Sequence, residues 1–90
     1  MGTALVTLKI MPESPEANLE EIENSAKEKI ESNEGNEVKF KEEPIAFGLK
    51  AIIINFSLDE NKELEVIENE IKDIDQVNSV QVIDMRRAFG

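Results

Sequence analysis

Two short segments of this sequence contain residues suited to recognition of another molecule. Phe47 lies between a proline and a glycine in residues 44–48, and Arg86 and Arg87, the only arginines, are adjacent near the end of the chain. Exposed aromatic and guanidinium groups are the side chains that dominate binding at protein interfaces. Each segment also has a plainer interpretation. Phe47 could cap the hydrophobic core, and the arginines could form an ordinary charged terminus.

The residue types needed for most chemistry are missing. The chain has no Cys and no His, so it lacks a thiolate nucleophile, zinc–thiolate ligands and the usual proton carrier near neutral pH. The spacing of Asp59, Asn61 and Glu63 resembles the start of a calcium loop, but Leu64 stands where that loop requires glycine. We therefore expect no enzyme, no cofactor and no metal site.

The charge of the chain limits the partners that it could bind. Its net charge is −10, and every acidic residue except Asp84 lies within residues 13–43 or 59–75. We interpret these two blocks as solvated helix faces, which would repel a phosphate backbone, so direct nucleic-acid binding is not expected. No apolar run is long enough to span a bilayer, and the start of the chain lacks the features of a signal peptide. The expected location is cytoplasmic.

Hydrophobic periodicity predicts six elements along the 90 residues. They are a strand over 4–11, a helix over 19–32, strands over 37–42 and 49–58, a helix over 62–74 and a strand over 77–85. Asn18 is the expected N-cap of the first helix, with Glu21 completing a capping-box-like pair, and Gly35 marks the end of that helix. Glu23 and Lys27 are spaced as an i,i+4 ion pair on the wet side of the helix.

This order is typical of the α+β ferredoxin-like fold, a split βαβ sandwich. We expect a single domain over residues 1–90, with a four-stranded antiparallel sheet in the order 4-1-3-2 and both helices on one face. Within the sheet we expect the first and third strands to be parallel neighbours in the centre, flanked by antiparallel edge strands.

The shared parity of the strand residues predicts which side chains are buried against the helices, and it places Ile53 on the open face. The predicted buried set is Val6, Leu8, Ile10, Ile22, Ile30, Phe40, Ile52, Ile54, Phe56, Ile67, Ile71, Val80 and Val82. The same topology predicts that Phe47 and the two arginines lie at one end of the sheet and share a rim.

Three segments resemble those of a known family. They are Ile10-Met11-Pro12-Glu13-Ser14-Pro15, Pro44-Ile45-Ala46-Phe47-Gly48-Leu49-Lys50 and Asp84-Met85-Arg86-Arg87. The chain resembles archaeal translation elongation factor 1-beta over its whole length. That family is ferredoxin-like and acts as the guanine-nucleotide exchange factor for elongation factor 1-alpha, the GTPase that carries tRNA.

The resemblance implies roles for individual residues. Phe47 is similar to a loop aromatic that inserts into a pocket on the nucleotide domain of the GTPase. Arg87 is similar to a basic residue that reaches toward the magnesium and phosphate site. The implied partner-binding residues are Pro44, Ile45, Ala46, Phe47, Gly48, Asp84, Arg86 and Arg87. We expect a monomer when the chain is free. The alternative is a small-molecule-sensing regulatory domain of the same fold, dimeric through its sheet.

Overall fold

The predicted order of elements is confirmed by the computed structural model, which describes residues 2–88, with the side chain of Ala88 left out. The elements are β1 (Thr3–Pro12), α1 (Leu19–Ser32), β2 (Asn36–Pro44), β3 (Lys50–Asp59), α2 (Leu64–Lys72) and β4 (Val77–Ala88). The first helix has the predicted bounds. The second is shorter than predicted, and the last strand extends three residues further.

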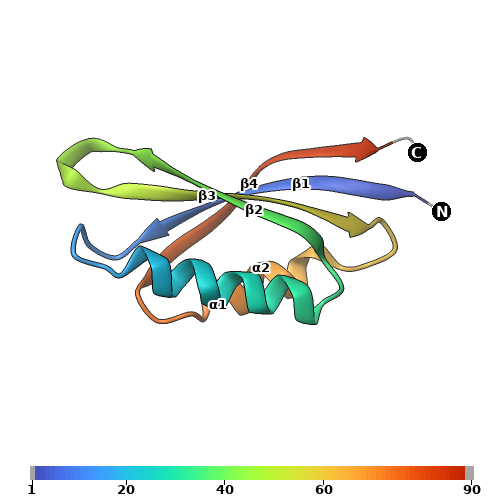
Figure 1. Ribbon diagram of the computed structural model, residues 1–90, viewed down its shortest axis with the longest axis horizontal. Coiled ribbons are helices and arrows are strands. Elements are labelled where there is room, and N and C mark those ends of the chain that lie inside the picture. Colours follow the sequence, from blue (N-terminus) through green and yellow to red (C-terminus); the bar gives the residue numbers. More distant parts are fainter. Residues whose placement is uncertain (1, 89–90) are drawn as a thin grey trace.

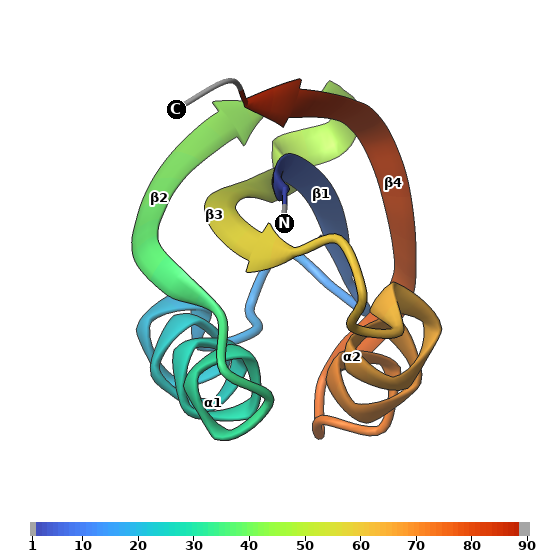
Figure 2. The ribbon, with the colours of Figure 1, turned by 90° about the vertical axis from the view of Figure 1, so that its right-hand side faces the viewer.

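The four strands form one sheet with the order β2-β3-β1-β4, which is the predicted order read from the other edge. Both helices lie on the same side of this sheet, and the opposite side carries no helix (Figure 1). Viewed end-on, β2 and β4 arch away from the helices and make the open side concave (Figure 2). The fold is therefore the ferredoxin-like α+β arrangement.

One part of the predicted topology is wrong. β1 and β3 pair antiparallel, with Thr3 opposite Asp59 and Ile10 opposite Ile52, and they are not parallel neighbours. The crossover through α1 makes β1 parallel to β2, whereas the tight β2–β3 connection reverses the chain. Because β3 lies between β1 and β2, it must run opposite to both. The crossover through α2 then makes β4 parallel to β3 and antiparallel to β1.

The core lies between the sheet and the two helices, as the parity of the strand residues predicts. Ile52 and Ile54 are fully buried with the apolar stripes of α1 and α2, and burial of such a side chain contributes about 1.5–3 kcal/mol. The predicted set is confirmed, although Phe40, Val80 and Val82 are only partly buried at the edges of the core.

The open face is less exposed than its lack of helices suggests. Ile53 is 9% exposed and Ala51 is buried, although neither belongs to the core cluster. The same face carries a hollow, called here the trough, whose lining includes Leu5, Thr7, Lys39, Asn55 and Arg86. On the floor of the trough the Thr7 hydroxyl donates a hydrogen bond to Asn55 Oδ1 at 2.6 Å.

The start of α1 is held partly by a residue from another element. The Asn18 Oδ1 atom accepts the backbone N–H of Glu21 at 3.1 Å, which confirms the predicted N-cap. The predicted return bond from Glu21 is absent, because the Asn18 N–H donates to Gln76 Oε1 at 3.0 Å. Gln76 precedes β4 and has a φ of 73°. A residue in the left-handed conformation therefore links the β1–α1 connection to the α2–β4 connection.

Glu34 adopts the left-handed conformation that closes α1, with a φ of 67°, and the predicted terminator Gly35 follows it. The Gly35 N–H donates to the carbonyl of Ile30 at 2.8 Å, and the Glu34 N–H donates to that of Glu31 at 3.0 Å. This is the Schellman pattern. Gly35 is still required, because a Cβ at this position would collide with the Ile30 side chain.

Glu23 faces an acidic residue and not its predicted partner. The ion pairs within residues 2–88 do not include Glu23 with Lys27. Partial burial raises the pKa of Glu23, and the nearby carboxyl of Glu42 on β2 and that of Glu20 raise the pKa further. Because folding raises this pKa, protonation of Glu23 stabilises the folded chain. That contribution is present at low pH and is lost as pH rises through the folded pKa.

We predict that Glu23→Gln raises the melting temperature at pH 7 and raises it less at pH 4. The neutral amide removes the repulsion from Glu42 only where Glu23 would be ionised. Thermal unfolding at the two pH values measures the effect. Glu28→Gln, an exposed position on the same helix, controls for the change in net charge. Equal shifts for both variants at both pH values would contradict the prediction.

Candidate functional site

The two groups of predicted site residues lie at opposite ends of the molecule. Pro44 pairs with Lys50 at the end of the sheet where β1 finishes, whereas Ala88 pairs with Thr3 where β1 begins. In Figure 1 the β2–β3 loop and the end of β4 lie toward opposite ends of the long axis, along which the molecule spans 42 Å. The predicted shared rim is therefore wrong. The error follows from the strand directions. Because β3 and β4 are parallel, β3 begins at the end of the sheet where β4 also begins, and β4 finishes at the opposite end.

The β2–β3 loop presents Phe47 on a tight turn. Phe47 has φ 63° and ψ 29°, and Gly48 has φ 77°. The Leu49 N–H donates to the carbonyl of Ala46 at 3.3 Å, and the Ile45 N–H donates to that of Leu49 at 2.7 Å. Two consecutive left-handed residues inside such a bond are the pattern of a type I′ turn, which favours Asn followed by Gly. Glycine suits its position, but phenylalanine does not.

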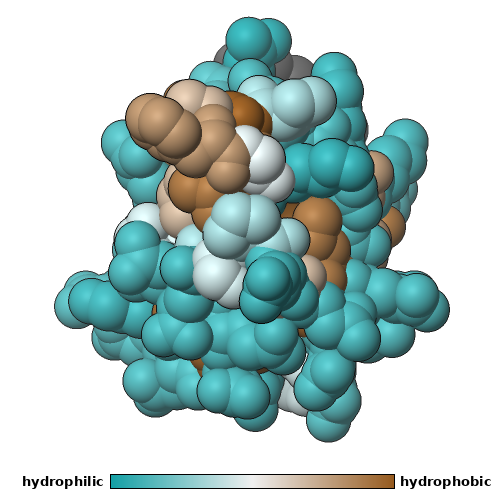
Figure 3. Space-filling view, turned by 90° about the vertical axis from the view of Figure 1, so that its left-hand side faces the viewer, coloured by the Kyte–Doolittle hydropathy of each residue, from teal (hydrophilic) through white to brown (hydrophobic). Residues whose placement is uncertain are grey.

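Phe47 is 93% exposed, so the alternative in which it caps the core is wrong for the free chain. Figure 3 looks onto this end and shows a hydrophobic patch rising from largely hydrophilic surroundings. A bulky residue in the left-handed region costs on the order of 1–2 kcal/mol. An aromatic side chain in water gains no burial to offset this cost. Strain and exposure at the same residue are typical of a position maintained for binding.

A bulge in β4 determines how the arginines are presented. Thr7 of β1 pairs with Asp84 and the next residue, Leu8, pairs with Val82, so Ile83 is an extra residue in β4. Beyond it, Arg86 lies opposite Leu5 on the open face, and Arg87 lies opposite Ala4 on the helix face. The two adjacent arginines therefore lie on opposite faces of the sheet.

Each arginine has its own acidic partner. Arg86 Nε lies 2.9 Å from Asp84 Oδ2, two residues earlier on the same strand. Arg87 Nε lies 3.0 Å from Glu60 Oε2, which follows β3. Sequence reasoning singled out Asp84 but missed Glu60. The signal that could have found it is the register, since Thr3 opposite Asp59 places Gly2 beside Glu60. Phe89 and Gly90, the end of the tail, lie outside the described residues.

The site offers contacts and charge. Within residues 2–88 no group of three or more acidic side chains is placed to hold a metal ion. In the same part of the chain, no helix combines the length and the apolar character needed to cross a membrane. The β2–β3 loop can insert the apolar ring of Phe47 into a partner, and the end of β4 can present the guanidinium of Arg87 to a different part of that partner.

Comparison with known proteins assigns the chain to a family. The model of the EF-1 guanine nucleotide exchange domain matches residues 5–88. The protein named elongation factor 1-beta of Methanocaldococcus jannaschii is 38% identical over 89 residues, covering 98% of this chain and 100% of the relative. That of Methanothermobacter thermautotrophicus is 39% identical over 89 residues, covering 97% and 98%. That of Methanobrevibacter smithii is 38% identical over 88 residues, covering 97% and 98%.

These likenesses extend over almost the whole of both chains and include both ends of the candidate site. They favour nucleotide exchange over the alternative of a small-molecule-sensing regulatory domain, and they confirm the resemblance found in the sequence. The chain therefore belongs to the EF-1 guanine nucleotide exchange domain family, and it is a guanine-nucleotide exchange factor of translation elongation.

Proposed function

We propose that this chain promotes GDP release and GTP reloading of elongation factor 1-alpha by holding that GTPase at two separate places. The observation that carries the proposal is Phe47, which is almost fully exposed on a strained turn. The family assignment supplies the reaction class. The factor forms and breaks no covalent bond in this role, so it acts by binding alone and is not an enzyme in that sense.

The two contacts have different roles because the two ends are far apart. The molecule spans 42 Å along the axis that separates the β2–β3 loop from the end of β4. A mechanism in which Phe47 and Arg87 act together at one nucleotide site does not fit this length. We assign Arg87 to the phosphate and magnesium site, because a cation can offset charge that the metal neutralised. Phe47 then anchors the factor in an apolar pocket elsewhere on the GTPase.

Exchange follows if this pair of contacts fits the nucleotide-free GTPase better than the nucleotide-bound one. Only such a difference in affinity shifts the equilibrium toward release. A guanidinium that competes with Mg²⁺ for the phosphate site supplies the difference at one end. The anchor at the other end makes that competition intramolecular and so raises its effective concentration.

The remaining expectations about partners belong to the same proposal. The chain acts as a cytoplasmic monomer and binds no nucleic acid directly. The net charge of −10 supports the lack of direct nucleic-acid binding, because the acidic surface repels phosphate backbones. The same surface would steer the factor toward a basic partner, so association should weaken as salt concentration rises.

The direct test of the proposal is the release of fluorescent GDP from elongation factor 1-alpha of the same organism. Stopped-flow traces with and without this chain give the rate of release. We expect acceleration that saturates with the concentration of the factor. Release at the spontaneous rate at every factor concentration would overturn the proposal.

We predict that Phe47→Asn stabilises the chain while it impairs exchange. Asn tolerates the left-handed region, so the free energy of unfolding should rise by about 0.5–1 kcal/mol. Loss of the anchor should slow GDP release by about tenfold or more. Chemical denaturation and stopped-flow release measure the two effects.

Phe47→Ala is the matched variant, since it removes the ring and keeps an unfavourable left-handed residue. It should impair exchange with little change in stability. If Phe47 instead packed on the core in solution, truncation would cost on the order of 3 kcal/mol or more. Such a loss, with normal exchange per folded molecule, would contradict the assignment.

We predict that Arg87→Ala slows GDP release by about tenfold or more and that Arg87→Lys slows it much less, since a positive charge suffices at the phosphate site. Neither should change the melting temperature appreciably, because an exposed terminal charge stabilises little. Arg86→Ala, on the other face of β4, should have a small or intermediate effect. Stopped-flow release at two salt concentrations measures all three variants. Wild-type rates in Arg87→Ala would leave Phe47 as the sole contributor.

A further inference from the structure

Glu60 lies where it can control the direction of the Arg87 side chain. Its Oε2 atom is 3.0 Å from Arg87 Nε, although the two residues belong to strand ends that are separated by β1. The Glu60 side chain is 33% exposed and that of Arg87 is 68% exposed. In this contact the more buried carboxylate of Glu60 restrains the guanidinium of Arg87, which is largely exposed to solvent.

The carboxylate reaches across β1 because Gly2 leaves its path free. A Cβ built on Gly2 would lie 2.5 Å from Glu60 Cδ and Oε2 and 2.6 Å from Oε1. The backbone supports the same placement, since the Glu60 N–H donates to the carbonyl of Gly2 at 3.1 Å. Glu60 thus occupies the space that any other residue at position 2 would fill.

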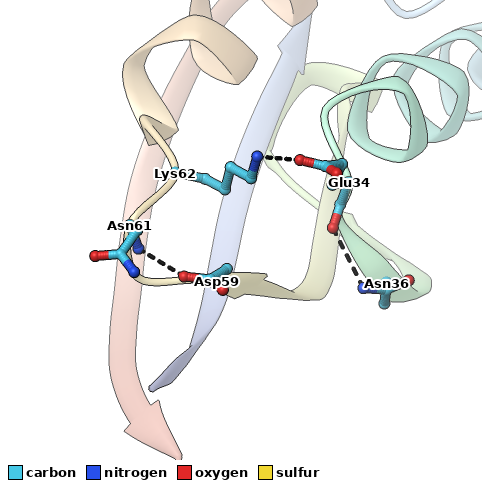
Figure 4. A network of polar contacts seen from close by, with 5 residues as sticks. All are labelled: Glu34, Asn36, Asp59, Asn61 and Lys62. Atoms are coloured by element: carbon cyan, nitrogen blue, oxygen red, sulfur yellow. Dashed lines mark hydrogen bonds and ion pairs between the residues drawn. The ribbon is translucent and has the colours of Figure 1, made fainter. Parts of the chain in front are cut away.

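The turn that carries Glu60 is itself held in place. The Asn61 N–H donates to Asp59 Oδ1 at 2.8 Å, and Lys62 forms an ion pair with Glu34 at the end of α1 (Figure 4). The Lys62 N–H also donates to the Asp59 carbonyl at 2.9 Å. Bonds on both sides of Glu60 restrict the turn, so its carboxylate starts from a fixed backbone position.

We propose that Glu60 is a positioning residue that orients Arg87 before the partner binds, an inference that rests on the proposed role of Arg87 in exchange. A free arginine side chain has many rotamers, and ordering it on binding opposes association. Contact at Nε restrains the side chain near its head and keeps that ordering cost low. Glu60 therefore accelerates exchange through Arg87 without touching the nucleotide.

Two variants disturb the contact in different ways. Glu60→Ala removes the carboxylate. Gly2→Ala keeps both Glu60 and Arg87 but displaces the Glu60 carboxylate. Only the flexible end of the Glu60 side chain has to move to make room for the new methyl group. The control is Glu34→Gln, which weakens the other ion pair of this turn and does not involve Arg87. If loosening of the turn alone mattered, the control would behave like the other two variants.

We predict that Glu60→Ala and Gly2→Ala each lower the second-order rate constant of GDP release by about three- to tenfold. Glu34→Gln should retain the wild-type rate constant. In an Arg87→Ala background, Gly2→Ala should have no further effect, since the residue that it acts through is gone. Faster release with Glu60→Ala would overturn the proposal, because Glu60 would then shield Arg87. A wild-type rate constant for Gly2→Ala would overturn it as well.

A measurement on the free chain separates this inference from the proposed function. The chain has two arginines, so a ¹⁵N-labelled sample gives two Nε–Hε signals, and Arg86→Lys identifies the one that belongs to Arg87. We expect the order parameter of Arg87 Nε to fall in Glu60→Ala and Gly2→Ala but not in Glu34→Gln. An unchanged order parameter overturns the positioning role. A falling order parameter together with wild-type release by Arg87→Ala overturns only the role of Arg87 in exchange.

Discussion

The pairing register of β1 with its two neighbours is the constraint on which the rest of the molecule depends. Val6, Leu8 and Ile10 face the helices only in this register, and a slip by one residue would turn all three to the open face. The same register brings Gly2 beside Glu60 and Ala4 beside Arg87. Burial of the core thus determines which charged groups meet near the end of β4.

Much of the fold could be predicted from the sequence because the signals are local. The apolar stripes give both helices, and alternation correctly separates Ile52 and Ile54 from Ile53. The Asn18 cap needs only the residues that follow it. Strand direction is different, because it depends on how two crossovers and one hairpin combine. Among neighbouring strands, the predicted direction was wrong only for β3 relative to β1, and this single error placed Phe47 and the arginines at the same end of the predicted sheet.

The features of the fold and of the site that sequence reasoning missed depend on long-range geometry. Glu60 and Gln76 act on residues distant in the chain, and neither stands in a pattern that marks it. The segment 44–48 could be identified from its residue types, but the left-handed backbone of Phe47 could not, since that conformation favours other residues. The binding role that we propose for Phe47 would account for an unfavourable residue at this position, where local preference and observed conformation disagree. The cost is confined to a loop outside the core, so it does not weaken the packing of the sheet.

The extra residue in β4 has a consequence for which of the two arginines lies beside Glu60. Because side chains alternate along a strand, Ile83 reverses the parity of every residue that follows it. In a ladder without the bulge, Ile83 would pair with Thr7, so Arg86 would lie opposite Ala4 on the helix face, where Arg87 now lies, and Arg87 would lie opposite Thr3 on the open face. Loss of the bulge, with no change in either arginine, would therefore be sufficient to exchange the faces on which the two arginines lie.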